Sequence, residues 1–242
     1  MGVNIRPYVI INDKSSKEVN GLLISDLPPI SKPKMRVSAQ EIDGRSGDIV
    51  SELGFSAYDK EINVGLFGDY NIDEVISFFN QSGKITFSNE PDKYYLFAQY
   101  NGIDFEKLLR YKTANVAFHC QPFKYSVSEG VREFDFSSEA SSGELYIRNN
   151  GNYISKPTIT LTGSGTVNLA INDITLMAVN MSTYHTIIIN SDEMNAYDTD
   201  GLLRNRQITG DIDKIALASG KNKISYTGTV TKITIENQSR WL

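Results

Sequence analysis

Few side chains in this sequence have the chemistry of a catalytic or ligand-binding group. There are two histidines, His119 and His185, and a single cysteine, Cys120. His119 and Cys120 are adjacent in an alternating, strand-like pattern, so we expect their side chains on opposite faces, where they cannot form a base and nucleophile pair. His185 follows Tyr184 at the expected start of a strand, and a structural role is expected for it. A lone cysteine excludes an intrachain disulfide and a cysteine-based zinc site, so Cys120 is interpreted as a small apolar strand residue.

Three short motifs resemble parts of ligand sites. Gly163-Ser-Gly165 resembles half a phosphate-binding loop, but no helix is expected after it, so we predict a hairpin. Asp198-Thr-Asp-Gly201 resembles a calcium loop whose first and last positions lack carboxylates, so a β-turn is predicted. Asp211-Ile-Asp213 places two carboxylates on one face of an expected strand, a weak glycosidase signal. We therefore expect no catalytic residues, no metal ion and no cofactor, and no enzymatic activity.

The composition favours a globular β protein. Hydrophobic residues make up 40% and charged residues 22%, and the 13 Tyr and 11 Phe, with many Ile, Val and Thr, favour strands. A net charge of −5 argues against nucleic-acid binding, which needs a surplus of Lys and Arg. The longest apolar run, Ile174–Val179, is too short to cross a membrane, and Met1–Tyr8 lacks the apolar core of a secretory signal. We expect synthesis in a cytoplasm and no membrane insertion.

The segment from Met35 to Phe67 is the hardest to place inside a compact domain. It begins and ends with the alternation of half-buried strands, whose apolar positions are Met35, Val37, Ala39, Ile62, Val64 and Leu66. Glu41–Phe55 lies between them, contains turn residues at Asp43-Gly44, and is too long for an ordinary connection. We predict a projecting hairpin arm that lies on another chain, with a mobile surface loop as the alternative. The candidate interface residues are Ile42, Asp43, Arg45, Ile49, Val50, Leu53 and Phe55.

The elements around the arm predict a β domain with one helix over residues 1–126. The helix is expected after the capping residue Asn71 and before Gly83. Asn101-Gly102 is predicted to be a hairpin turn. Expected strands are Ile5–Ile11, Leu22–Leu27, Lys84–Phe87, Tyr94–Tyr100, Phe105–Arg110 and Tyr111–Phe118.

Residues 127–242 are predicted to form a second domain, an antiparallel β-sandwich. Ser126–Gly143 is interpreted as a connection with a short strand at Val131–Phe136. Short strands at close spacing then alternate with turn residues, as in sandwich folds. They are Leu145–Asn149, Thr158–Leu161, Val167–Ile171, Ile174–Val179, Thr186–Ile189, Gln207–Gly210, Lys223–Tyr226 and Lys232–Glu236.

Several stretches occur in an order that resembles a known family. They are Asp43-Gly-Arg-Ser-Gly-Asp48, Phe87-Ser-Asn-Glu-Pro-Asp-Lys-Tyr-Tyr95, and Leu217-Ala-Ser-Gly-Lys-Asn-Lys-Ile224 leading to Ser239-Arg-Trp-Leu242. Together with the chain length, they resemble the distal tail protein (Dit) family of bacteriophages with long non-contractile tails, over essentially the whole chain. The resemblance implies an N-terminal β domain with a helix and a projecting hairpin that assembles as a hexameric ring. It also implies a C-terminal β-sandwich similar to galectins and carbohydrate-binding modules.

The same resemblance implies a structural virion protein at the tail tip. Such a hub joins the tail tube to the tip, with tail-tube, tape-measure, tail-tip and receptor-binding proteins as partners. Some family members carry inserted sugar-binding modules, for which 242 residues leave no room. Two alternatives remain: a tail-tube subunit, which also oligomerises through hairpins, or a free carbohydrate-binding module. The aromatic candidates for a sugar platform are Tyr146, Tyr153, Tyr184, Tyr197 and Trp241.

Overall fold

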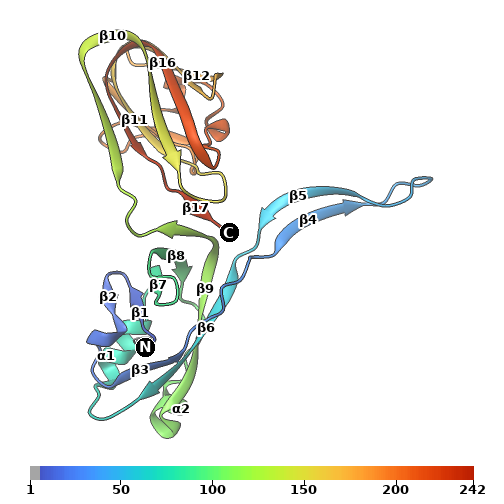
Figure 1. Cartoon of the computed structure of the whole chain (residues 1–242), viewed down its shortest axis with the longest axis vertical. Helices are drawn as coiled ribbons and strands as arrows, with labels where there is room; N and C mark the ends of the chain where they lie inside the picture. Colours follow the sequence, from blue (N-terminus) through green and yellow to red (C-terminus); the bar gives the residue numbers. More distant parts are fainter. Residues whose placement is uncertain (1–5) are drawn as a thin grey trace, which may run out of the picture. The chain divides into compact units, whose positions relative to one another are not determined.

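The chain folds into two compact units of mainly β structure. The computed structural model describes residues 6–242, without the side chains of residues 137–140. One unit ends at Val127 and the other spans Ser128–Trp241. Figure 1 shows both, and each is described separately below. None of the described helices is long and apolar enough to cross a membrane.

The first unit is built on an antiparallel sheet with the strand order β2-β1-β7-β8-β9-β6-β3. The strands are β1 (Val9–Ile11), β2 (Lys14–Ser15), β3 (Leu22–Asp26), β6 (Tyr58–Leu66), β7 (Gly83–Phe87), β8 (Lys93–Ala98) and β9 (Thr113–Ser126). β1 corresponds to the expected opening strand, of which Ile5 lies outside the described residues. The alternation predicted for β6 is confirmed, because Ile62, Val64 and Leu66 are buried.

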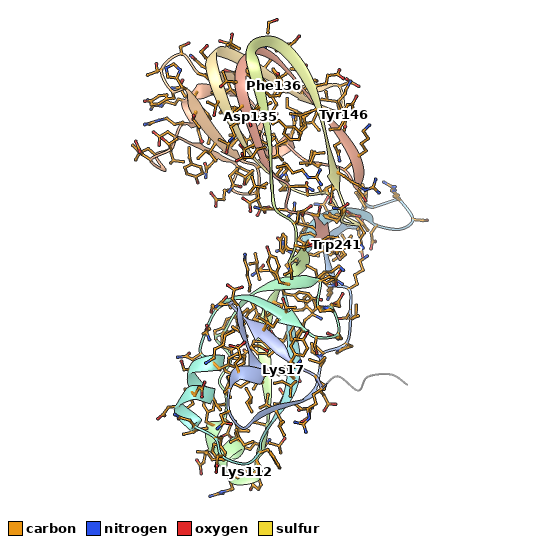
Figure 2. The ribbon with its side chains drawn as sticks, turned by 60° about the vertical axis from the view of Figure 1, so that its left-hand side comes forward. Lys17, Lys112, Asp135, Phe136, Tyr146 and Trp241 are labelled. Atoms are coloured by element: carbon orange, nitrogen blue, oxygen red, sulfur yellow. The ribbon has the colours of Figure 1, made fainter. Side chains whose placement is uncertain are left out.

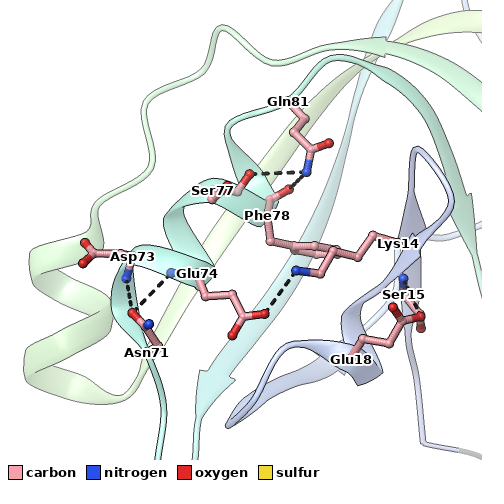
Figure 3. A network of polar contacts seen from close by, with 9 residues as sticks. All are labelled: Lys14, Ser15, Glu18, Asn71, Asp73, Glu74, Ser77, Phe78 and Gln81. Carbon is pink, nitrogen blue, oxygen red and sulfur yellow. Dashed lines mark hydrogen bonds and ion pairs between the residues drawn. The ribbon is translucent and has the colours of Figure 1, made fainter.

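The helix α1 (Ile72–Phe79) packs against one face of this sheet, as the sequence predicts. Asn71 caps it: its side-chain oxygen accepts hydrogen bonds from the backbone N–H groups of Asp73 and Glu74, at 3.0 and 3.4 Å. Figure 3 shows this cap and the 3.1 Å ion pair between Glu74 and Lys14, which ties the helix to β2. The buried side chains of the helix are Val75, Phe78 and Phe79, and they join the aromatic core of the sheet.

The predictions for residues 99–111 are wrong. Phe105–Tyr111 forms the helix α2 instead of a strand, and β8 leads into it without a hairpin turn at Asn101-Gly102. Asp104 caps α2 by accepting a hydrogen bond from the backbone N–H of Lys107 at 2.8 Å. Lys112, labelled in Figure 2, ends it in a left-handed conformation with φ 58°. Leu108 is the single buried residue within α2, so the sequence does not show buried apolar residues repeated every three to four positions, which would have predicted a helix.

The predicted hairpin arm is present. β4 (Met35–Gln40) and β5 (Ile49–Phe55) form a separate two-stranded sheet that projects from the first unit (Figure 1). The strands pair antiparallel from Met35 opposite Phe55 to Gln40 opposite Ile49, and residues 41–48 connect them. The half-buried character expected of the first strand is wrong, because it lies beyond the core and both of its faces are largely exposed.

The second unit has an antiparallel sheet with the strand order β10-β16-β11-β12-β15, and β13 and β14 extend it from β11. The strands of this sheet are β10 (Val131–Asn149), β11 (Thr158–Ile171), β12 (Ile174–Asn180), β13 (Thr186–Asn190), β14 (Asn195–Tyr197), β15 (Ile208–Gly210) and β16 (Gly220–Glu236); β17 (Arg240–Trp241) is not part of it. Several short strands predicted from the sequence are therefore halves of long ones. The stretch expected to be a connection before Gly143 largely belongs to β10.

In three of these long strands the pairing register shifts at neighbouring positions, and the strands bend there, so that one sheet folds into a sandwich. The irregularities lie between Asp135 and Ser142 in β10, between Thr162 and Asn168 in β11, and near Gly228 in β16. Gly228 has φ +110°, and a Cβ there would lie 2.3 Å from a backbone oxygen of β11, so a side chain is excluded. Such bulges bend strands, and the arch of β10 is visible in Figure 1. The buried residues of both halves form one core.

Candidate assembly site

The histidine and cysteine candidates occupy structural positions. His119 Nδ1 lies 2.7 Å from Asp59 Oδ1 on the outer face of the sheet, and the Tyr100 ring packs 4.9 Å from the imidazole. Cys120 points into the core with no exposed surface, so the prediction that the two side chains point to opposite faces is confirmed. Burial raises the pKa of the Cys120 thiol to about 12, which keeps it protonated and unreactive. His185 contacts the Gly163 carbonyl oxygen at 3.3 Å.

The ligand-like motifs are structural too. Gly163-Ser-Gly165 lies inside β11 at its bulge, so the hairpin prediction is wrong. Asp198-Thr-Asp-Gly201 is the predicted turn, in which Asp198 Oδ1 accepts backbone hydrogen bonds from Asp200 and Leu202 at 3.0 and 2.9 Å. The bond from Leu202 lowers the pKa of Asp198. Asp211-Ile-Asp213 is not a strand but the start of a 3-10 helix, and Asp211 pairs with Lys214. Among the side chains that the structure describes, no cluster of His, Cys, Asp and Glu could hold a metal ion.

The aromatic candidates for a sugar platform have neighbours of their own. Lys221 Nζ lies 3.9 Å from the centre of the Tyr146 ring, and the Arg204 guanidinium lies 4.2 Å from that of Tyr184. The hydroxyl of Tyr197 donates to Glu193 at 2.7 Å. Tyr146 lies on β10, as Figure 2 shows, whereas Tyr184 precedes β13. These three rings therefore make local contacts at separate places in the fold.

The arm has the surface of a binding element. Its larger apolar side chains are mostly exposed, with exposed fractions of 51% for Val37, 46% for Ile42, 38% for Ile49, 57% for Val50 and 55% for Leu53. Phe55, at the root, is partly buried and packs edge-on against Phe123 of β9 with ring centres 5.9 Å apart. Exposed apolar side chains gathered in this way usually mark an interaction site.

One face of the arm carries an apolar stripe that includes Val37 and Ala39, which were not among the predicted interface residues. Directly opposed residues in an antiparallel pair share a face. Val37 lies opposite Glu52, and Ala39 lies opposite Val50, so these four side chains share one face. The alternation in β4 was visible in the sequence, but it predicted a face turned toward the core of its own domain. The structure turns that face outward.

The opposite face carries the other apolar residues. Ile49, Ser51 and Leu53 are every second residue of β5, so all three side chains lie on this face. The Arg36 guanidinium donates to the Leu53 carbonyl oxygen at 3.0 Å, next to a bulge where Gly54 has φ +88°. The selected apolar residues are therefore not one patch but two surfaces of a thin hairpin.

The tip of the arm is fully exposed. The backbone N–H of Arg45 donates to the Ile42 carbonyl oxygen at 3.1 Å and closes a turn. Gly44 and Gly47 adopt φ values of +81° and +80° with open space around them. The structure contains no ion pair between Arg45 and either of the two aspartates of the tip, Asp43 and Asp48. The charges of the tip are therefore available to another surface.

A buried lysine holds the root of the arm. Lys60 is 3% exposed, and its ammonium donates to the Pro29 carbonyl oxygen at 3.2 Å. The ammonium lies 4.7 Å from the centre of the Tyr95 ring and 5.1 Å from that of Tyr58. Burial lowers the pKa of Lys60 and raises that of Tyr58 to about 12. The segment that leads into β4 is thus fixed to β6, a feature that the sequence did not reveal.

A second contact fixes the same segment. The Asn89 side-chain amide donates to the Pro28 carbonyl oxygen at 3.0 Å. The turn that carries Asn89 is itself held by Glu90, whose carboxylate accepts from Lys124 at 2.8 Å and from the Tyr95 hydroxyl at 3.1 Å. The direction in which the arm leaves the domain is therefore set by buried polar contacts.

Comparisons with known proteins agree with the fold resemblance expected from the sequence. No family model matches the sequence, and no match was found among curated proteins. The structure is similar to that of the Dit protein of phage SPP1, a hub of the adsorption apparatus in phages that infect Gram-positive bacteria. The TM-score is 0.67 at 16% identity, over 98% of this chain and 99% of that one. Two structures of the activated baseplate of phage p2, with calcium and with strontium, are also similar. Their TM-scores are 0.40 and 0.45 at 10% and 9% identity, over 95% and 97% of this chain and 98% of each of theirs. Over 98% of its length, this chain has the fold of the SPP1 distal tail protein.

Proposed function

We propose that this protein is a distal tail hub of a bacteriophage with a long non-contractile tail. Copies of the chain assemble into a hexameric ring that joins the tail tube to the tail-tip and receptor-binding apparatus. The observation that carries the proposal is the likeness to the SPP1 hub protein over almost the full length of both chains. The exposed arm adds support, because a monomer would leave its apolar side chains in water.

The arm is the proposed contact between neighbouring subunits. Its interface residues are Ile42, Asp43, Arg45, Ile49, Val50, Leu53 and Phe55, joined by Val37 and Ala39 from β4. Apolar surface removed from water contributes about 25 cal/mol per Å², from which the cost of ordering the arm is subtracted. In a ring, each arm lies on the next subunit, and its strand edges are also covered.

The two units have different proposed roles. Residues 1–126 form the proposed ring, and the β-sandwich of residues 127–242 is the proposed peripheral domain outside the ring. The proposed partners are the tail-tube protein, the tape-measure protein, and the tail-tip and receptor-binding proteins. The role is structural, and its place is the tail tip of the virion after synthesis in the host cytoplasm.

The mass of the purified particle tests this function. Six copies of a 27.0 kDa chain give a ring of about 162 kDa, which mass photometry and native mass spectrometry resolve from other assemblies. A single closed species of that mass is expected. A monomer at micromolar concentration would contradict ring assembly, whereas open stacks of rings would instead indicate a tail-tube subunit.

A further inference from the structure

The first unit has a groove on the outer face of its sheet, on the side turned away from α1. Its volume is about 280 Å³, and its lining includes Ile10 of β1, Lys84 and Thr86 of β7, and Pro91 and Tyr94 near β8. The inner faces of these strands are occupied by the aromatic core. The outer face thus carries an apolar hollow that α1 does not cover.

A single cation lies in the wall of this groove. Lys84 is paired across the strands with Leu96, which is 37% exposed, and its ammonium lies 4.9 Å from the centre of the Tyr94 ring. Among the described residues, no carboxylate forms an ion pair with Lys84. The carboxylate of Asp13 is the one acidic group at the rim, on the turn between β1 and β2.

The apolar stripe of the arm has the complementary pattern. Val37, Ala39 and Val50 supply apolar surface, and Glu52 supplies a single carboxylate within the stripe. Glu52 is exposed and forms no ion pair in the described chain. An apolar stripe with one anion is complementary to the apolar part of the groove around Lys84, whose rim carries Asp13 on the turn between β1 and β2.

The positions of the two surfaces suit a ring. The arm grows from β3 and β6 at one end of the strand order, whereas the groove lies on β1, β7 and β8 at the other end. Contacts between two different surfaces of identical chains are heterologous, and they form a closed ring when the rotation permits. A strand of the arm spans roughly 20 Å, enough to cross several strands of a neighbouring sheet.

We infer that this groove is the acceptor site for the arm of a second copy of the chain, with Glu52 of one copy facing Lys84 of the next. The inference rests on the proposed ring and identifies the surface that closes it. The stripe of Val37, Ala39 and Val50 covers the groove, and the tip extends past it toward the turn between β1 and β2. Both unpaired charges gain a partner in this contact.

Cross-linking between single-cysteine chains tests the location. In a Cys120→Ala background, a chain with Val50→Cys is assembled with a differently tagged chain with Leu96→Cys, and a short bismaleimide is added. A cross-linked heterodimer is expected. The matched control pairs Val50→Cys with Asn63→Cys, which is also exposed but lies on β6 in the arm-bearing half of the sheet. Linkage to Asn63→Cys in place of Leu96→Cys, or linkage within a single chain that carries both Val50→Cys and Leu96→Cys, would overturn the assignment.

A charge swap tests the pairing. Glu52→Lys and Lys84→Glu should each weaken ring assembly by about tenfold, because each brings like charges together. A chain with both substitutions should return to within about threefold of the wild type, since the pair is then reversed. Glu236→Lys on β16 and Lys107→Glu on α2, both exposed and outside the arm and the groove, are matched controls with little expected effect.

The outcomes separate this inference from the proposed function. A wild-type ring of the expected mass whose assembly ignores both the single and the double swap would leave the hub proposal standing and remove this acceptor site. A wild-type chain that never forms a ring would instead remove the hub proposal. Additive damage in the double variant also counts against the pairing.

Discussion

The ammonium of Lys60 donates a hydrogen bond to the carbonyl oxygen of Pro29, 31 positions earlier in the chain. This contact joins β6 to the segment that enters the arm, and it is shielded by the rings of Tyr58 and Tyr95. A buried cation is costly to desolvate, and the lowered pKa of Lys60 reflects that cost. We interpret Lys60 as a positioning residue for the arm, since its hydrogen bond fixes the segment from which the arm departs.

Lys60→Met should loosen the root of the arm while the domain stays folded. The substitution keeps the buried aliphatic volume and relieves the desolvation cost, but it leaves the Pro29 carbonyl without its donor. A lost buried hydrogen bond costs about 1–3 kcal/mol locally. We expect amide exchange in residues 30–36 to accelerate by roughly tenfold or more, consistent with that local cost. Hydrogen exchange with mass spectrometry measures it.

Lys14→Met is the control, because it also removes a lysine ammonium, but one that pairs with Glu74 of α1 and does not touch Pro28 or Pro29. It should accelerate amide exchange in α1 and not at the root of the arm. Equal protection of residues 30–36 in Lys60→Met and in the wild type would refute the positioning role.

Cys120 should make the first unit sensitive to alkali. Burial raises the pKa of its thiol from an ordinary 9.0 to about 12 in the folded chain. Above pH 9 the unfolded state loses this proton and the folded state keeps it, so stability is complete below pH 9 and declines as the pH rises toward 12. The slope from this group is at most about 1.4 kcal/mol per pH unit.

Cys120→Ala isolates the effect. At pH 7.5 the variant should lose on the order of 1 kcal/mol from the cavity, without loss of assembly. Between pH 9 and 11 the stability gap to the wild type should close or reverse, because the variant has no thiol to ionise. Urea unfolding followed by circular dichroism across this range measures the difference in stability between the two chains. A gap that stays constant with pH would contradict the assigned thiol.

The second unit should fold on its own when residues 127–242 are expressed as a fragment. The strands from β10 to β16 share one core, and the start of the unit is clamped to its end. The Glu129 carboxylate accepts hydrogen bonds from the Ser239 backbone N–H at 2.5 Å, the Ser239 hydroxyl at 2.7 Å and the Asn237 amide at 2.9 Å. Well-dispersed amide resonances are expected.

A fragment that starts at residue 132 provides the control. It lacks Glu129, so the buried backbone N–H and hydroxyl of Ser239 lose their acceptor, whereas the Asn237 amide keeps the Arg148 carbonyl oxygen; stability should fall by about 1–3 kcal/mol relative to the longer fragment. Collapsed spectra from residues 127–242 would show that the proposed domain boundary is misplaced.

The sequence predicted an element correctly where residues close together in the chain determine it, as the two helices of the first unit show. α1 was predictable because its cap, Asn71, and its buried positions all lie within a dozen residues. α2 was not, because it buries Leu108 alone and follows an Asn-Gly pair that is typical of hairpins. Its capping residue, Asp104, was the signal that could have found it.

The long strands and the arm could not be predicted in full, because contacts between residues far apart in the sequence determine them. Gly163 and Gly228 look like chain breaks in the sequence, but they mark bulges inside continuous strands, where β11 pairs with the distant β16, as in Gly163 with Val230 and Asn168 with Thr227. The alternation of Val37 and Ala39 predicted a strand with an apolar face. It carried no information on whether that face meets its own core or another molecule, which depends on tertiary structure.

Removal of the arm should abolish the ring and spare the fold. Replacing residues 43–54 with an Asn-Gly turn deletes most of β5, including its exposed apolar residues Ile49, Val50 and Leu53. The core of the first unit contains none of the deleted residues, so circular dichroism should show a folded chain. Without the stripe and the strand edges, size exclusion with light scattering should report a monomer.

A shorter deletion separates the tip from the stripe. Replacing residues 43–47 alone removes Asp43 and Arg45 but keeps the β4–β5 pairs, including Ala39 with Val50. Exposed charges contribute less than about 1 kcal/mol, whereas the apolar stripe supplies most of the binding energy. This variant should therefore still form rings, in which the arm is less precisely aligned on the neighbouring subunit. Rings from the long deletion would remove the arm from the assembly, and an unfolded long deletion would show that β5 belongs to the core.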